Sequence, residues 1–185
     1  DYFFFFFPQF PTGSWDLLAF SVTAGESEAV FSFIFADLSN PGRAPAGFSL
    51  PLVDLYIDIN RSIGAGTQDL LPGRPGLVEA ADAWEYAISV DGWTGRFIQA
   101  RSRQDSRDSP ALVVRKDDAS TFSVRVPRRL LRGDPADWGF AVVVMGRSLA
   151  GSAPMAVAVE PGPDRFGGAV PNRSAPPYID LLVPP

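Results

Sequence analysis

The stretch FSLPLVDLYIDI, residues 48–59, indicates most directly how this chain folds. Apolar and polar residues alternate in its second half, and a period of two is typical of a β-strand. One face of the expected strand carries Val53, Leu55, Ile57 and Ile59. The other carries Asp54, Tyr56 and Asp58, and we expect this polar face to meet either solvent or a ligand.

The neighbouring segments repeat the strand pattern. EAVFSFIFAD (28–37) is apolar on both faces, which is typical of a strand in the middle of a sheet. Further apolar runs, separated by Gly and Pro, predict strands at 16–24, 84–93, 97–102, 111–116, 121–127, 139–146, 155–160 and 178–183. PRRLLRG (127–133) predicts one short helix, and DSRDS (105–109) a solvated hairpin tip.

These patterns predict an all-β fold. About ten strands with one short helix, spaced by turns, indicate an antiparallel β-sandwich. The 17 glycines and 18 prolines are spread along the chain and mark no linker. We therefore expect residues 1–185 to form a single module.

Composition excludes several classes of function. The chain has no cysteine and no histidine, which removes disulfides, Ser-His-Asp triads and HExxH zinc sites. The formal net charge of -5 argues against binding to nucleic acid. Carboxylate-pair chemistry of the glycosidase kind stays open, but we do not expect an enzyme. No stretch is apolar for long enough to predict a transmembrane helix.

Six motifs in a fixed order resemble the C-terminal module of glucodextranase, which also occurs in amylopullulanase-type enzymes and in envelope proteins. They are GSWDLLAFSV (13–22), FADLSNPGRAPAGFSLPLVDLYIDI (35–59), DAWEYAISVDGW (82–93), RVPRRLLRGDPADWGFAVVVMG (125–146), DRFGGA (164–169) and YIDLLVP (178–184). FFFP (5–8) takes the position of a YxYP motif of that family. The resemblance covers essentially the whole chain.

The resemblance implies a fold and a role. The fold would be a DOMON-like, immunoglobulin-like sandwich related to family 9 carbohydrate-binding modules. The role would be non-catalytic and extracytoplasmic, with a polysaccharide or cell-wall glycan as the ligand. Haem-binding DOMON proteins use Met and His ligands; with no histidine, and methionine only at positions 145 and 155, we expect no haem here.

Three aromatic residues are candidates for sugar binding. A flat ring can stack on the apolar face of a pyranose while neighbouring polar groups bind its hydroxyls. Trp93 lies in the turn sequence DGWTG (91–95), where exposure is expected, and Trp15 follows Gly13–Ser14. Tyr56 lies on the polar face of the 48–59 strand. Trp84 and Trp138 are expected to pack in the core.

Three other residues are candidates for calcium binding, because calcium prefers hard oxygen ligands in loops. Asp58 leads into a Gly-rich loop, and Asp37 and Asn40 lie in ADLSNPG (36–42). Asp37 and Asn40 could equally start a loop through Asx-turns. Any metal site would have to be assembled from separate strands and loops, because the spacing matches no EF-hand.

The run YFFFFF (2–7) raises a second possibility. Alternation would send Phe3, Phe5 and Phe7 to one side of a strand and Tyr2, Phe4 and Phe6 to the other. One set needs cover from outside the core, which is typical of an interface. The alternative function is therefore a structural or protein-interaction subunit of an S-layer-type envelope assembly, contacting envelope proteins through the Phe3-Phe7 region.

Overall fold

The computed structural model describes residues 11–102, 105–148, 153–162, 165–171 and 175–182, with no side-chain detail for 101–111. The Phe3-Phe7 region lies outside the described residues. The strands are β1 (Leu17–Ala24), β2 (Glu28–Phe35), β3 (Pro51–Asp58), β4 (Tyr86–Val90), β5 (Gly95–Ser102), β6 (Asp105–Ala111), β7 (Val113–Lys116), β8 (Thr121–Pro127), β9 (Gly139–Gly146), β10 (Ala156–Val157), β11 (Arg165–Phe166) and β12 (Tyr178–Leu182). Three 3₁₀ turns accompany them: η1 (Ala80–Asp82), η2 (Arg128–Leu130) and η3 (Pro135–Asp137).

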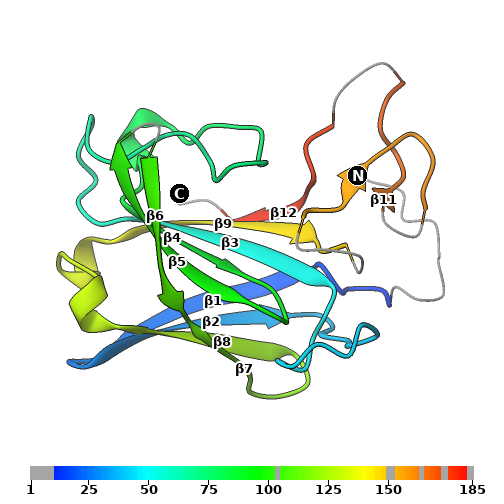
Figure 1. The fold of residues 1–185 in the computed structure, drawn as a ribbon, viewed down its shortest axis with the longest axis horizontal. Coiled ribbons are helices and arrows are strands. Elements are labelled where there is room, and N and C mark those ends of the chain that lie inside the picture. The colour runs from blue at the N-terminus through cyan, green and yellow to red at the C-terminus, as the bar shows by residue number, and fades with distance from the viewer. Residues whose placement is uncertain (1–10, 103–104, 149–152, 163–164, 172–174, 183–185) are drawn as a thin grey trace.

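Ten of these strands form two stacked sheets. One has the order β1-β2-β8-β7 and the other β12-β9-β3-β4-β5-β6, and all their pairings are antiparallel. Figure 1 shows the sheets as two layers, with β1, β2, β8 and β7 below the larger sheet. The predicted all-β sandwich is confirmed. β10 and β11 form a small parallel pair beside it.

The main core lies between the two sheets. Phe31, Phe33 and Phe35 of β2 face it and are fully buried, as their spacing of two predicts. The opposite side of β2 is only half covered, with Ile34 exposed. β2 is central in its sheet, since β1 and β8 flank it. Its apolar sequence suggested burial of both faces, but only the face of Phe31, Phe33 and Phe35 is fully buried.

A second hydrophobic cluster covers the outer face of the larger sheet. Its members are Leu52, Tyr56, Leu71, Trp84, Ala87, Ile98, Ala141, Val143 and Met145. The connection 59–85 passes over this face and supplies Leu71 and Trp84 to the cluster (Figure 1). The expected polar face of residues 48–59 is therefore corrected: all eight residues of β3 are buried.

Specific bonds hold this connection on the sheet. Arg74 makes a two-point ion pair with Asp54, with Nε–Oδ2 and Nη2–Oδ1 distances of 2.6 and 3.3 Å. The hydroxyl of Tyr56 accepts a hydrogen bond from the backbone N–H of Leu71 at 3.1 Å. The loop neutralises the charge of Asp54 and gives the Tyr56 hydroxyl a hydrogen-bond partner. The polar face of β3 can therefore be buried without leaving an unpaired charge.

The short helix predicted at 127–133 is the 3₁₀ helix η2. One smaller expectation needs revision. Residues 105–109 belong to β6, whose backbone pairs with β5, because a strand at a sheet edge tolerates polar residues. Within the residues that the structure describes, no helix has the length and apolar character needed to cross a membrane.

Candidate functional site

The candidate site is the turn Asp91–Thr94 that joins β4 to β5. The Asp91 carboxylate organises it: Oδ1 accepts hydrogen bonds from the N–H groups of Trp93 and Thr94, both at 2.7 Å, and from the Thr94 hydroxyl at 3.2 Å. The backbone N–H of Asp91 donates to the Thr94 carbonyl at 2.9 Å. Such a closed Asx-type turn fixes the direction in which Trp93 leaves the backbone.

Arg147 supports this turn from the neighbouring part of the sheet. It follows β9 directly, and its backbone N–H donates to the Leu50 carbonyl at 2.8 Å. Its Nε lies 2.6 Å from Asp91 Oδ2, and its Nη1 donates to the Ser148 carbonyl at 2.9 Å. Both side chains of the ion pair are buried, with 9% and 1% of their surface exposed.

The guanidinium group of Arg147 also stacks on Trp93. Its Cζ lies 3.6 Å from the centroid of the Trp93 ring, well inside the range of a cation–π contact. Trp93 is nevertheless partly exposed. One ion pair therefore both closes the turn and supports the indole ring.

Close packing holds the turn against the loop that precedes β3. An ideal Cβ placed on Gly92 would lie 1.8 Å from the Phe48 carbonyl oxygen. The Gly92 carbonyl in turn accepts a hydrogen bond from the Ala46 N–H at 3.0 Å. A residue without a side chain is required here because the two backbones touch.

The structure separates Trp93 from the other two aromatic candidates. Trp15 has 5% of its surface exposed, donates its indole N–H to the Leu50 carbonyl and packs edge-on against Phe166. Tyr56 has 1% exposed and lies beneath the 59–85 connection. Burial, and secondarily the charge of Asp54, raises the pKa of the Tyr56 phenol. Neither ring presents a face to a ligand here, so neither enters the site proposed below.

The three calcium candidates do not converge. Asp37 Oδ2 accepts hydrogen bonds from Ser14 and Ser39, and Asn40 Oδ1 accepts one from the Ala44 N–H. Asp58 Oδ1 accepts bonds from the N–H groups of Asn60 and Arg61. Asp58 ends β3, whereas the Asp37–Asn40 loop lies near its start, where Ser49 N–H bonds to the Ser39 carbonyl.

Asp37 and Asp58 thus use a carboxylate oxygen to accept hydrogen bonds from the backbone two or three residues further on, as in an Asx-turn. Asp58 Oδ2 is buried without a hydrogen-bond partner among the described residues. Those residues contain no group of three or more carboxylate side chains placed to hold a metal ion. Calcium binding by Asp37, Asn40 and Asp58 stays a prediction.

The sequence alone did not predict that Arg147 and Asp91 belong to the site. Arg147 ends an apolar strand segment, and no spacing connects it to Trp93. The sequence places Asp91 in the turn, but nothing in it indicates that Asp91 pairs with a buried arginine. Only the sheet register brings them together, since β3 pairs with both β4 and β9.

Fold and site together define an all-β binding module: two antiparallel sheets with a partly exposed tryptophan on a connecting turn. The chain belongs to the family of the C-terminal, SLH-like binding module of glucodextranase, whose family model matches residues 6–185. This confirms the resemblance read from the ordered motifs. The family is a binding module rather than a catalytic domain. A comparison with curated proteins finds no match.

Proposed function

We propose that this module binds a polysaccharide or cell-wall glycan, without catalysis and in an extracytoplasmic setting, through the ring of Trp93. The observation that carries the proposal is the Arg147–Trp93 stack. Trp15, Trp84 and Trp138 are buried and only Trp93 is partly exposed. A ring supported on one face by a guanidinium group loses little entropy when a sugar stacks on its other face.

The family supports the proposal at a coarser level, because it is a family of binding modules. The same membership supports the extracytoplasmic setting, since a module attached to a glycan-degrading enzyme or an envelope protein would meet its glycan outside the cytoplasm. The Thr94 hydroxyl, next to the ring, donates to Asp91 at 3.2 Å and could instead hydrogen-bond to a sugar hydroxyl.

Affinity electrophoresis tests the proposal. The wild-type chain and Trp93→Ala are run through gels containing α-glucan, β-glucan or purified cell-wall polymer. Leu77→Ala is the matched control, because Leu77 is an exposed apolar residue on the 59–85 connection. We expect at least one polymer to retard the wild type and Leu77→Ala, and Trp93→Ala to migrate as it does in an empty gel. Equal retardation of all three proteins would reject Trp93 as the platform, and no retardation of the wild type would reject glycan binding.

The alternative, a subunit of an envelope assembly that contacts proteins through the Phe3-Phe7 region, concerns a segment outside the described residues. The same gels address it: if no polymer retards the wild type, the alternative becomes the better account of the family membership.

A further inference from the structure

The tripeptide Asn60-Arg61-Ser62 follows β3 almost directly and matches the acceptor pattern for N-glycosylation: Asn, any residue except Pro, then Ser or Thr. The chain has three asparagines, and Asn172, which lies outside the described residues, begins a second Asn-Arg-Ser tripeptide. The third, Asn40, precedes a proline and does not match the pattern. The structure describes the tripeptide at Asn60, whose geometry can be compared with what an acceptor needs.

An acceptor asparagine has to be accessible, and Asn60 is. All five residues 60–64 are exposed. An ideal Cβ placed on Gly64 would meet no atom within 4 Å, and Ile63 has 79% of its surface exposed. The turn after β3 therefore leaves room for an oligosaccharide on Asn60.

Asn60 and Ser62 share one Asx-turn. Asn60 Oδ1 accepts a hydrogen bond from the Ser62 N–H at 2.8 Å, and the Ser62 hydroxyl donates to the Asn60 carbonyl at 3.2 Å. The first bond closes the turn, and any residue except proline would supply its N–H group. The fold thus explains the asparagine but does not require a hydroxyl at position 62, whereas an N-glycosylation acceptor does.

The side-chain nitrogen of Asn60 has a partner that can survive the modification. Asn60 Nδ2 donates to Glu85 Oε1 at 2.9 Å, in an exposed position. A carboxamide has two N–H donors, and a glycosylated carboxamide keeps one of them. The bond to Glu85 can therefore persist and orient the attached glycan.

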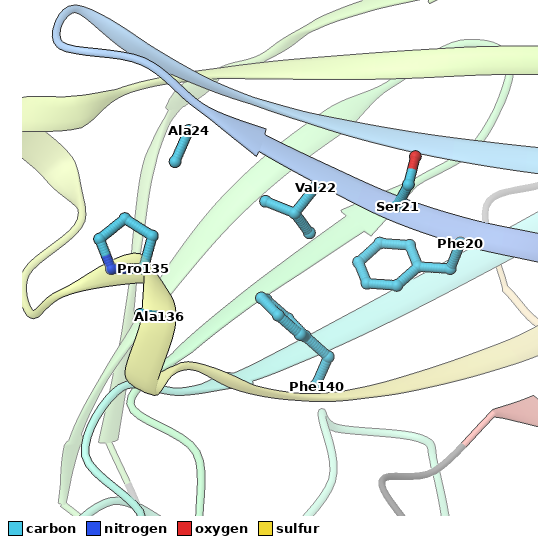
Figure 2. Close-up of a pocket in the computed structure, with 7 residues that line it drawn as sticks. All are labelled: Phe20, Ser21, Val22, Ala24, Pro135, Ala136 and Phe140. Carbon is cyan, nitrogen blue, oxygen red and sulfur yellow. The ribbon is translucent and has the colours of Figure 1, made fainter.

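The backbone of Asn60 is fixed at one end of the larger sheet. Its N–H donates to Asp58 Oδ1 at 2.9 Å, and Asp58 pairs with Gly139, the first residue of β9. The next residue, Phe140, lies toward Phe20 of β1 in Figure 2 and packs against the main core. Its ring therefore points into the sandwich and leaves the exposed turn uncovered.

Asn60 and Trp93 lie at opposite ends of β3. The Trp93 turn follows β4, whose last residue, Val90, pairs with Val53 near the start of β3. Asn60 comes after the end of β3, and an eight-residue strand is about 25 Å long. Attachment of a glycan to Asn60 is thus compatible with an open Trp93 ring.

We propose that Asn60 is an N-glycosylation site. Transfer joins Asn60 Nδ2 to C1 of an oligosaccharide that is carried on a lipid phosphate ester. The bond from C1 to the phosphate oxygen breaks, the lipid phosphate leaves, and the proton released by the amide passes to solvent. The glycan is bulky and polar, and it shields the exposed side chain of Ile63. The inference rests on the extracytoplasmic setting proposed above, because such acceptors belong to surface loops of secreted proteins, but not on sugar binding by Trp93.

Peptide mapping by mass spectrometry tests the proposal on the natural protein, isolated from the cells that make it after separation of their cytoplasmic and extracytoplasmic fractions. The same cells also produce Ser62→Ala, which removes the hydroxyl, and Ser62→Thr, which keeps it. Ser62 is exposed, so both variants should fold, and circular dichroism verifies this. The peptides that contain Asn60 and Asn172 are measured separately.

We expect the Asn60 peptide of the wild type and of Ser62→Thr to exceed its sequence mass by that of an oligosaccharide, and Ser62→Ala to lose this increment. An unmodified Asn60 in the wild type, or an increment that persists in Ser62→Ala, overturns the proposal. If the unmodified protein comes from the extracytoplasmic fraction, only the inference about Asn60 fails. A protein found in the cytoplasmic fraction rejects the proposed setting as well, and the gels decide sugar binding by Trp93 independently.

Discussion

The guanidinium carbon of Arg147 lies 3.6 Å from the centre of the Trp93 ring, while its Nε lies 2.6 Å from the Asp91 carboxylate. A single buried cation thus links the end of β9, the β4–β5 turn and the exposed indole. Loss of Arg147 should therefore both destabilise the turn and remove the support of the Trp93 ring.

Replacing Arg147 by Met should destabilise the module by about 3–5 kcal/mol, because it leaves the buried Asp91 carboxylate without its cation. Urea unfolding followed by circular dichroism measures the loss. The matched control is Arg125→Met, which breaks the half-exposed ion pair with Glu28 and should cost about 0–1 kcal/mol. Equal costs in the two variants would show that the Asp91–Arg147 pair is not a buried support.

Gly92→Ala should also damage the turn. The added Cβ would lie 1.8 Å from the Phe48 carbonyl oxygen, so the backbones must separate; we expect a cost of about 3 kcal/mol or more. At Gly25 a Cβ would meet only the Glu28 carbonyl oxygen, at 3.5 Å. Gly25→Ala should therefore be nearly neutral, and a thermal unfolding comparison in which both variants melt together would contradict the packing described at Gly92.

Alkaline pH should weaken the attachment of the 59–85 connection through Tyr56. Burial first, and Asp54 second, raises the pKa of this phenol above its ordinary value of about 10. The folded state therefore keeps a proton that the unfolded chain releases, so the stabilising contribution is complete below about pH 10 and falls as the pH rises further.

The variant Tyr56→Phe isolates this effect. It should cost about 1–3 kcal/mol at neutral pH, because the Leu71 N–H loses its acceptor. It should also flatten the decline of unfolding free energy as the pH rises above about 10. Burial raises the pKa of Tyr86 and Tyr178 as well, so a smaller decline should remain. An unchanged pH dependence in Tyr56→Phe would contradict the assignment.

The sequence periodicity predicted the strands but not the 59–85 connection that covers the outer face of β3. The alternation of residues 53–59 identified β3 and its inner face, and the spacing of Phe31, Phe33 and Phe35 identified the inner face of β2. The burial of Asp54 and Tyr56 could not be foreseen in the same way. It depends on Arg74 and Leu71, which lie in an aperiodic, Gly- and Pro-rich segment whose path over the sheet leaves no pattern in the sequence.

The candidate site was predictable to a similar extent. The Asp-Gly before Trp93 and the Thr-Gly after it marked a turn and partial exposure, and Trp93 is partly exposed. Trp15 also follows a Gly-Ser pair, yet it is buried because Leu50 and Phe166, both distant in sequence, enclose it. Arg147 joined the site only through the pairing of β3 with β4 on one side and β9 on the other.

The central claim, that Trp93 is the sugar platform, can be tested most directly by NMR. The chain has four tryptophans, so a ¹⁵N-labelled sample should show four indole N–H resonances, assigned by single Trp→Phe variants. On titration with oligosaccharides released from whichever polymer retards the wild type in gels, the account predicts that the Trp93 resonance shifts with saturation while those of Trp15, Trp84 and Trp138 stay in place. A saturable titration that leaves Trp93 unmoved, or that moves a buried indole instead, would contradict it.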